Sequence, residues 1–98
     1  MKSGIWKTFL ALCSSSSDME KLDEFFELIF TKEEHETIEK RLIVIRNLLD
    51  EKITQREISR QYKVSISSIT RGSNALKIVS DELKESLKKT LLAKDVKC

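Results

Sequence analysis

The chain has 98 residues, no proline and only two glycines, Gly4 and Gly72. Because turns between strands draw heavily on Gly, Pro and Asn, this composition argues against a β-sandwich, a β-barrel or a glycine-rich phosphate loop. Charged residues make up 35% of the chain and hydrophobic residues 40%, and this mixture, rich in Leu, Ile, Glu and Lys, favours helices. We expect one small domain over residues 1–98, which gains stability from a partner subunit.

The net charge of +2 conceals an uneven distribution along the chain. Residues 18–39 carry a formal charge of −7, whereas residues 40–77 carry +6. No acidic residue occurs between Ile58 and Ser80. A basic block of this kind is either an ordinary solvated face or a surface that binds nucleic acid.

Hydroxyl residues ahead of apolar, periodic stretches mark the helix starts. In three places Glu follows three positions later, and in this pattern the two side chains satisfy free backbone N–H groups reciprocally. The predicted caps are Ser17 with Glu20, Thr31 with Glu34, Thr54 with Glu57, Ser65 and Ser80. They indicate an all-α chain of about six helices, over residues 4–13, 18–30, 33–49, 55–61, 66–78 and 81–93. Residues 94–98 are expected to form a frayed tail.

The N-terminal segment superficially resembles a short export or lipoprotein leader, with Lys2 ahead of an apolar stretch that ends at Cys13. However, Lys7 interrupts the apolar run, and Leu12 is too large for the position before a processed cysteine. We therefore predict a short amphipathic helix that packs on the domain of a cytoplasmic protein. No apolar run is long enough to span a bilayer.

The predicted helix over residues 33–49 carries a broad apolar stripe. Its members are Ile38, Leu42, Ile43, Val44, Ile45, Leu48 and Leu49. A stripe this broad buries against more than one neighbour, and residues 25–30 add more apolar surface than a small monomer readily covers. We therefore predict a homodimer in which residues 1–49 are mainly dimerisation helices. The alternative is that these side chains fill a single core.

Residues 54–78 fit a helix-turn-helix, which we call the helix-turn-helix segment. Its expected core residues are Ile58, Tyr62, Val64 and Ile69, and Ser59 is the small residue where the two helices cross. The turn lacks the glycine often found there, so Lys63 must either accept or avoid a left-handed conformation.

A helical wheel divides the second helix of this segment into three faces. The apolar face holds Ile69, Gly72 and Leu76, the face suited to base edges and phosphates holds Ile66, Thr70, Ser73 and Lys77, and the third holds Ser68, Arg71 and Ala75. An arginine among small residues can bind a carboxylate and stack on a flat ring. The alternative is a solvated arginine beside small residues that suit helix packing. A glycine inside a helix costs about 1 kcal/mol relative to alanine, so Gly72 indicates a close approach there.

These residues resemble a known family. Thr70-Arg71-Gly72-Ser73-Asn74-Ala75-Leu76-Lys77 is similar to the signature of the bacterial tryptophan repressor family, and Gln55-Arg56-Glu57 resembles the start of its helix-turn-helix. Leu28-Ile29-Phe30-Thr31, with Glu33, Glu34 and Arg41, matches the upstream region at the family's spacing, and Trp6 fits the first helix. The resemblance covers nearly the whole chain. It implies an intertwined, all-helical homodimer that binds L-tryptophan as corepressor and then operator DNA, and so regulates tryptophan biosynthesis genes.

The resemblance also implies residue roles in the ligand site. Arg41 and Arg71 would sandwich the indole, and Arg71 would also bind the carboxylate. Thr31 would contribute its hydroxyl from the other subunit, and the carbonyls of Leu28 and Phe30 would accept from the ligand's ammonium group near a helix C-terminus. The other expected ligand-binding residues are Ser68, which keeps the hydroxyl of the family's usual threonine, Gly72, which leaves room for the ring, and Ala75.

On the DNA side, the resemblance implies two groups of contacts. Base edges would be contacted by Ile66, Ser67 and Thr70. Phosphates would be contacted by Gln55, Arg56, Ser73 and Lys77, with Arg56 also able to reach a guanine.

The chain departs from the family pattern at several positions. Ala75 replaces a serine whose hydroxyl helps to hold the ligand's amino group, and this leaves open a regulator of the same fold with another ligand or none. Ser59 replaces a lysine, and Lys63 and Val64 replace small residues of the turn. We expect the changes at Ser59, Lys63 and Val64 to alter operator preference.

Two other classes of function make different predictions. A helical protein-interaction module with an incidental basic stretch would show no salt-dependent affinity for DNA. An enzyme is not expected, because the chain offers no nucleophile–base pair or carboxylate pair. Cys13 and Cys98 lack metal-ligand spacing and lie far from His35 in the sequence, so we expect free thiols in a reducing cytosol and no metal.

Overall fold

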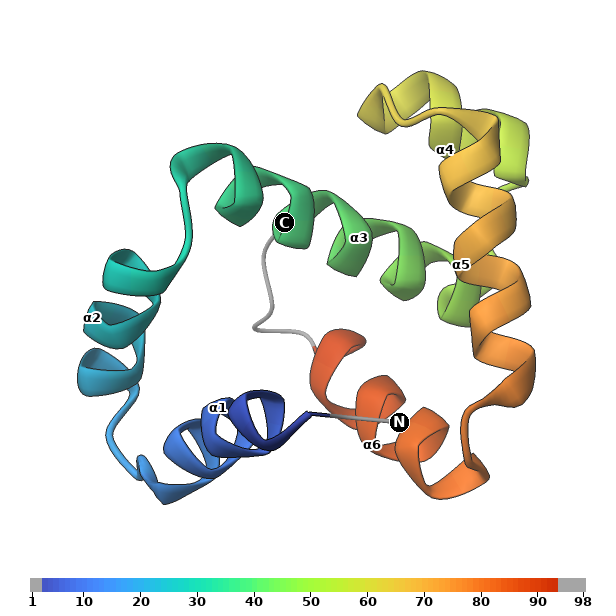
Figure 1. Ribbon diagram of the computed structural model, residues 1–98. Coiled ribbons are helices and arrows are strands. Elements are labelled where there is room, and N and C mark those ends of the chain that lie inside the picture. The colour runs from blue at the N-terminus through green and yellow to red at the C-terminus, as the bar shows by residue number, and fades with distance from the viewer. Residues whose placement is uncertain (1–2, 94–98) are drawn as a thin grey trace. The chain divides into compact units, whose positions relative to one another are not determined.

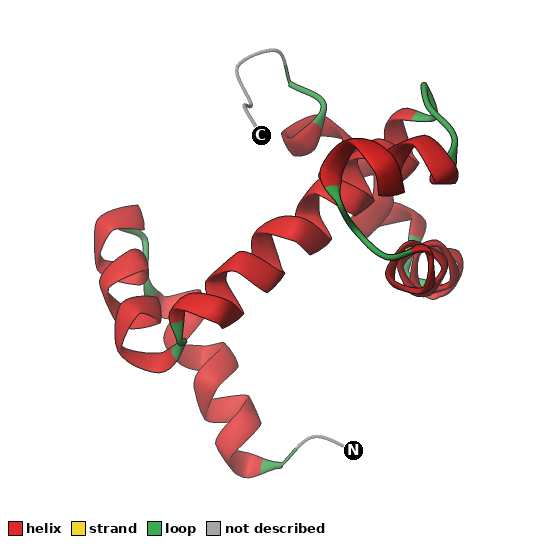
Figure 2. Cartoon of the chain, turned by 90° about the horizontal axis from the view of Figure 1, so that it is seen from above, coloured by secondary structure: helices red, strands yellow, loops and turns green. Residues whose placement is uncertain are grey.

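The computed structural model describes residues 3–93, and the regular structure within this range is helical (Figures 1 and 2). Its helices are α1 (Gly4–Ser15), α2 (Met19–Ile29), α3 (Lys32–Asp50), α4 (Gln55–Tyr62), α5 (Ile66–Ile78) and α6 (Asp81–Leu91). Each predicted helix is confirmed, and α5 has the predicted bounds. The predicted frayed tail, residues 94–98, lies outside the described residues.

The chain divides into two compact units, Met1–His35 and Glu36–Cys98. The first unit contains α1, α2 and the first turn of α3, and the second contains the rest of α3 with α4, α5 and α6. None of the helices within residues 3–93 combines the length and the apolar character needed to cross a membrane. Within the same residues, His, Cys, Asp and Glu side chains form no group of three that could hold a metal ion.

Aromatic side chains pack α1 against α2 in the first unit. The ring of Phe9 lies 5.2 Å from that of Trp6 and 5.9 Å from that of Phe25, measured between centroids. Phe30 packs edge-on against Phe26 at 5.2 Å. Ring pairs at such distances stabilise a fold beyond the apolar area that they bury. The predicted packing of an N-terminal helix is therefore confirmed, with α2 as its neighbour.

The core of the second unit lies where α3, α4 and α5 meet. Val44, Ile58, Val64 and Ile69 are buried, with Ile58 and Ile69 almost completely inaccessible. Tyr62, which was also expected in the core, is half-buried and packs at its edge. The predicted helix-turn-helix core is thus confirmed, and the structure adds Val44 of α3 to it.

The apolar stripe of α3 faces two different environments. Val44 is buried and Leu48 packs against the core, whereas Ile38 and Leu42 are 39% and 42% exposed. The single chain therefore covers only part of the stripe. The N-terminal half of α3 presents apolar side chains to the solvent, which is typical of helices that pack against another chain.

Local capping explains most helix starts. Thr54 and Glu57 form a capping box at the start of α4. The Glu57 amide donates to the Thr54 hydroxyl and the Thr54 amide donates to the Glu57 carboxylate, both at 3.2 Å. The same reciprocal bonds join Thr31 and Glu34 at the start of α3. The predicted caps Ser65 and Ser80 also accept amide hydrogen bonds, from Ser68 and Leu83.

The prediction for the start of α2 is wrong in its capping residue. The carboxylate of Asp18, and not the hydroxyl of Ser17, accepts the hydrogen bond from the Glu20 amide, at 2.9 Å. An Asp cap also places a negative charge at the positive end of the helix dipole. This charge favours Asp18 over the neighbouring serine.

Lys63 adopts the left-handed conformation in the turn between α4 and α5. Its φ and ψ angles are 56° and 48°. The amide of Val64 donates to the Ser59 carbonyl at 3.2 Å and closes the end of α4. Of the two alternatives for this turn, Lys63 therefore accepts the left-handed conformation, which glycine adopts more easily.

Candidate functional site

The helix-turn-helix segment places α4 and α5 side by side, joined by the left-handed turn (Figure 1). Ile69 points its side chain into the core from α5, and Ile58 does so from α4. Both helices keep their polar faces exposed. The apolar face that the helical wheel assigned to α5 is confirmed by the complete burial of Ile69.

Gly72 is the point of close approach between α5 and α3. A Cβ atom at this position would lie 3.3 Å from Cγ1 of Val44 and 3.6 Å from Cδ1 of Leu48. Carbon atoms pack best at about 3.5–4.0 Å, so a methyl group would press on Val44. The expected close approach at Gly72 is confirmed, and the element that approaches is α3.

The third face of α5 is open to the solvent. Ser68, Arg71 and Ala75 are all exposed, and Arg71 is adjacent to the contact that Gly72 makes with α3. Arg41 is also exposed and lies three residues before Val44, on a neighbouring turn of the same side of α3. The hydroxyl of Ser68 accepts a hydrogen bond from Ser65 at 2.8 Å.

The other expected ligand-binding residues belong to the first unit. Leu28 is 81% exposed at the end of α2, and Phe30 is its C-cap, with its amide bonded to the Phe26 carbonyl. The last carbonyl groups of a helix lack partners within the helix and carry the negative end of its dipole. The Thr31 hydroxyl accepts from the Glu34 amide at 3.1 Å, which leaves its own hydrogen available to donate.

The expected base-edge residues lie near the start of α5. Thr70 is exposed, and Ile66 is 49% exposed although it is apolar. Ser67 is exposed and its hydroxyl lies 3.2 Å from that of Ser65. These three side chains present an apolar group and two hydroxyls on the solvent side of the helix.

Three of the four expected phosphate contacts line one open hollow in the second unit. Gln55 comes from the start of α4, and Ser73 and Lys77 come from α5. The fourth, Arg56, is exposed beside Gln55 but does not line the hollow.

The hollow also includes Lys84 of α6 and Glu51, which follows α3 in a left-handed conformation with φ of 58°. Sequence reasoning did not single out either of them. Both lie outside residues 58–80, the stretch without acidic residues, and neither belongs to a local sequence pattern that indicates DNA binding.

This arrangement, with an exposed polar face on the second helix and basic side chains beside it, is typical of the helix-turn-helix class of DNA-binding proteins. A family model described as Trp repressor protein matches residues 4–91. The chain belongs to this family, and it is a tryptophan-responsive transcriptional repressor. The family is a regulatory one that binds operator DNA and uses tryptophan as corepressor; it is not enzymatic.

Curated relatives of similar length support the assignment. A Trp operon repressor homolog of Chlamydia caviae is 47% identical over 83 residues, which cover 85% of this chain and 82% of the relative. A homolog of the same name from Chlamydia trachomatis serovar D is 43% identical, with 88% and 92% covered. The Trp operon repressor homolog of Vibrio vulnificus is 36% identical, with 88% and 84% covered.

Proposed function

We propose that the protein is a cytoplasmic homodimer that binds L-tryptophan between residues of both subunits, then binds operator DNA and represses tryptophan biosynthesis genes. The ligand site would consist of Arg41, Arg71, Ser68, Gly72 and Ala75 from one chain, with Leu28, Phe30 and Thr31 from the other. The observation that carries this proposal is the contact of Gly72 with Val44, which brings the backbone of α5 next to α3 with Arg71 exposed beside it.

The chemistry of the site suits an amino acid. Arginine binds a carboxylate with two parallel hydrogen bonds and stacks on an aromatic ring. The carbonyl groups at the end of α2 offer a negative dipole to an ammonium group. A ligand bound against α5 shifts the orientation of that helix only if it binds one orientation more tightly than the other. We expect tryptophan to favour the orientation in which the α5 helices of the two subunits fit successive major grooves.

Calorimetry of L-tryptophan into the purified protein, with the Arg71→Ala variant in parallel, tests the ligand site. We expect the wild type to bind one tryptophan per subunit and the variant to bind none, because the carboxylate and the ring both lose their partner. Arg60→Ala is the matched control, since Arg60 is an exposed arginine of α4 outside the proposed site. Arg71 is exposed, so circular dichroism of Arg71→Ala should match that of the wild type. A melted fold would mean that Arg71 is a structural residue.

The proposed DNA contacts predict different effects at base edges and at phosphates. Thr70→Ala should weaken binding to operator DNA more than binding to a duplex of arbitrary sequence, because base-edge contacts alone carry sequence information. Competition binding with the two duplexes measures this difference. An equal loss on both would place Thr70 away from the bases.

The proposed homodimer accounts for the exposed apolar side chains of the first unit and of α3. Leu28, Ile29, Ile38 and Leu42 are between 39% and 81% exposed in the single chain. Leu42→Lys should therefore lower the sedimentation equilibrium mass towards that of a monomer, whereas Leu42→Met, which keeps an apolar side chain, should not. A wild-type monomer at high concentration would reject the dimer.

A regulator of the same fold with a different ligand, or none, is the second candidate. It is favoured by Ala75, which is exposed on the third face of α5 and has no hydroxyl to bind an amino group. Operator binding with and without L-tryptophan separates the two candidates. Equal affinity in both conditions would reject the first.

A further inference from the structure

The open hollow beside the helix-turn-helix segment has a volume of about 480 Å³. It is bounded by residues from four places in the second unit: the end of α3, the start of α4, α5 and α6. Gln55, Ser73 and Lys77 are the three lining residues already proposed to contact phosphates. Lys84 is a second lysine at the same hollow, although it belongs to a different helix.

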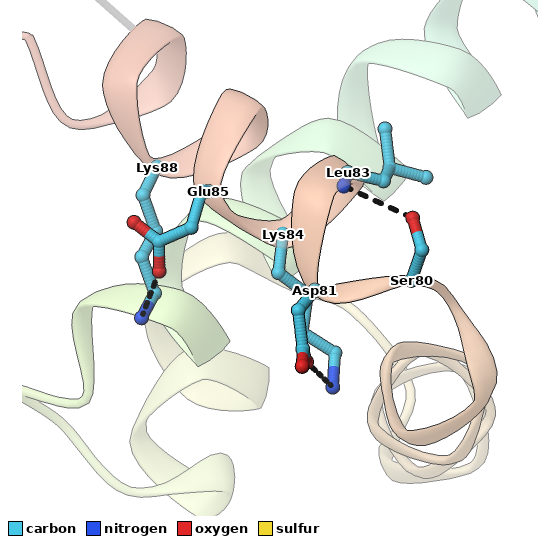
Figure 3. Close-up of polar contacts among 6 residues, drawn as sticks. All are labelled: Ser80, Asp81, Leu83, Lys84, Glu85 and Lys88. Carbon is cyan, nitrogen blue, oxygen red and sulfur yellow. Dashed lines mark hydrogen bonds and ion pairs between the residues drawn. The ribbon is translucent and has the colours of Figure 1, made fainter.

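Lys84 forms a weak ion pair within its own helix. Its ammonium lies 3.9 Å from the carboxylate of Asp81, which is fully exposed, while the Lys84 side chain is 30% exposed (Figure 3). Ion pairs with an exposed member contribute little to stability and are screened by salt. The helix dipole also disfavours a cation in the first turns of α6. A stronger anion would therefore compete readily for this ammonium group.

We infer that Lys84 holds a backbone phosphate of bound DNA, together with Gln55, Ser73 and Lys77. This inference rests on the proposed binding of DNA by the helix-turn-helix segment, and it adds a contact from α6 to that surface. A duplex lying along the polar face of α5 would pass Lys77, and Lys84 is the next cation at the hollow that Lys77 lines.

Glu51 acts against this contact. Glu51 lines the same hollow as Lys77 and Lys84. The formal charge of these three side chains together is therefore only +1. Repulsion between Glu51 and a phosphate would lower the affinity for any DNA sequence. Lys84 and Glu51 are therefore expected to have opposite effects on DNA affinity.

Lys88 provides a matched control for Lys84. It is a lysine of the same helix, and it forms an ion pair of the same i,i+3 spacing, with Glu85 at 3.7 Å (Figure 3). It does not line the hollow. Lys84→Gln and Lys88→Gln each remove one positive charge and one ion pair within α6. A difference between the two variants in DNA binding would therefore come from a phosphate contact.

The test measures binding of the full-length protein to a fluorescein-labelled duplex of arbitrary sequence over a series of salt concentrations. Each phosphate contact contributes about 0.9 to the slope of log affinity against log salt concentration. We expect Lys84→Gln to make this slope shallower by about 0.9 per helix-turn-helix segment. Between 1 M and ~0.1 M salt, the variant would therefore gain roughly eightfold less affinity than the wild type for each segment. Lys84→Arg should restore the slope, Lys88→Gln should leave it unchanged and Glu51→Gln should raise the affinity.

The outcomes separate this inference from the function on which it rests. If the wild type binds DNA without salt dependence, the proposed function fails and the inference fails with it. If Lys77→Gln lowers the slope but Lys84→Gln behaves like Lys88→Gln, only the inference is overturned. A decrease in affinity for Glu51→Gln would also overturn it, provided that circular dichroism shows the variant to be folded.

Discussion

The substitution Gly72→Ala offers a direct test of how α5 packs on α3. An alanine is favoured over glycine inside a helix by about 1 kcal/mol. The new methyl group would lie 3.3 Å from Cγ1 of Val44, inside the optimal contact distance. Val44 is 3% exposed and is enclosed by the core, so it can yield only slightly. Overpacking a core costs about 1–3 kcal/mol, and the value here should lie near the lower end because a single contact is involved.

The two effects nearly cancel, so we expect the free energy of unfolding of Gly72→Ala to stay within about 1 kcal/mol of the wild type. Urea denaturation at a fixed protein concentration measures this value, since the stability of an oligomer depends on concentration. The coupling to Val44 is more informative. Val44→Ala alone should cost about 2 kcal/mol through lost burial and a cavity.

In the Gly72→Ala background, Val44→Ala should cost about 1 kcal/mol less, because the crowding against the new methyl group is relieved and the cavity is partly filled. Additive effects, within about 0.5 kcal/mol, would refute the contact between Gly72 and Val44. Calorimetry with L-tryptophan then tests the second role proposed for Gly72. Because Val44 and Leu48 already lie against the place where a Cβ at Gly72 would be, a ring could only pack beside this position. Gly72→Ala should then weaken tryptophan binding by pushing α5 away from α3, even where stability is unchanged.

Three further changes are expected to alter stability, and each can be followed by thermal denaturation at fixed protein concentration. Lys63→Gly should stabilise the chain by about 0.5 kcal/mol, because relief of the left-handed backbone outweighs the entropy that glycine loses on folding; a lower melting temperature would contradict this balance. Asp18→Ala should destabilise by about 1 kcal/mol while Ser17→Ala has little effect, and the reverse order would restore Ser17 as the cap. Ile69→Ala should cost about 2–5 kcal/mol, whereas Ile66→Ala, at an exposed position, should cost far less; similar losses would show that α5 is turned differently.

Helix boundaries were largely predictable because capping is local. A cap joins groups two or three residues apart, as in the boxes of Thr31 with Glu34 and of Thr54 with Glu57. The conformational question at Lys63 could be posed from the sequence for the same reason, although only the structure answered it. The error at Ser17 shows the limit of this approach, since Asp18 next to it offers a competing and charged acceptor.

The packing of α5 on its own unit was only partly predictable. The wheel identified the apolar face and an odd glycine on it, but the sequence did not say which element approaches Gly72. The structure shows that Val44 and Leu48 do so, because α3 crosses α5 at that point. A contact between residues this far apart in the chain leaves no periodic trace.

The sequence by itself determined that this chain is a set of capped, amphipathic helices with a basic helix-turn-helix and the residues of the Trp repressor family. These properties follow from short-range hydrogen bonds, helical periodicity and the order of charges, all of which depend on residues that are close together in the sequence. Tertiary structure alone decided that Val44 is a core residue while Leu42 is exposed. It alone placed Lys84 and Glu51 at the hollow that holds Gln55 and Lys77, because folding brings these groups together from separate helices and their turns.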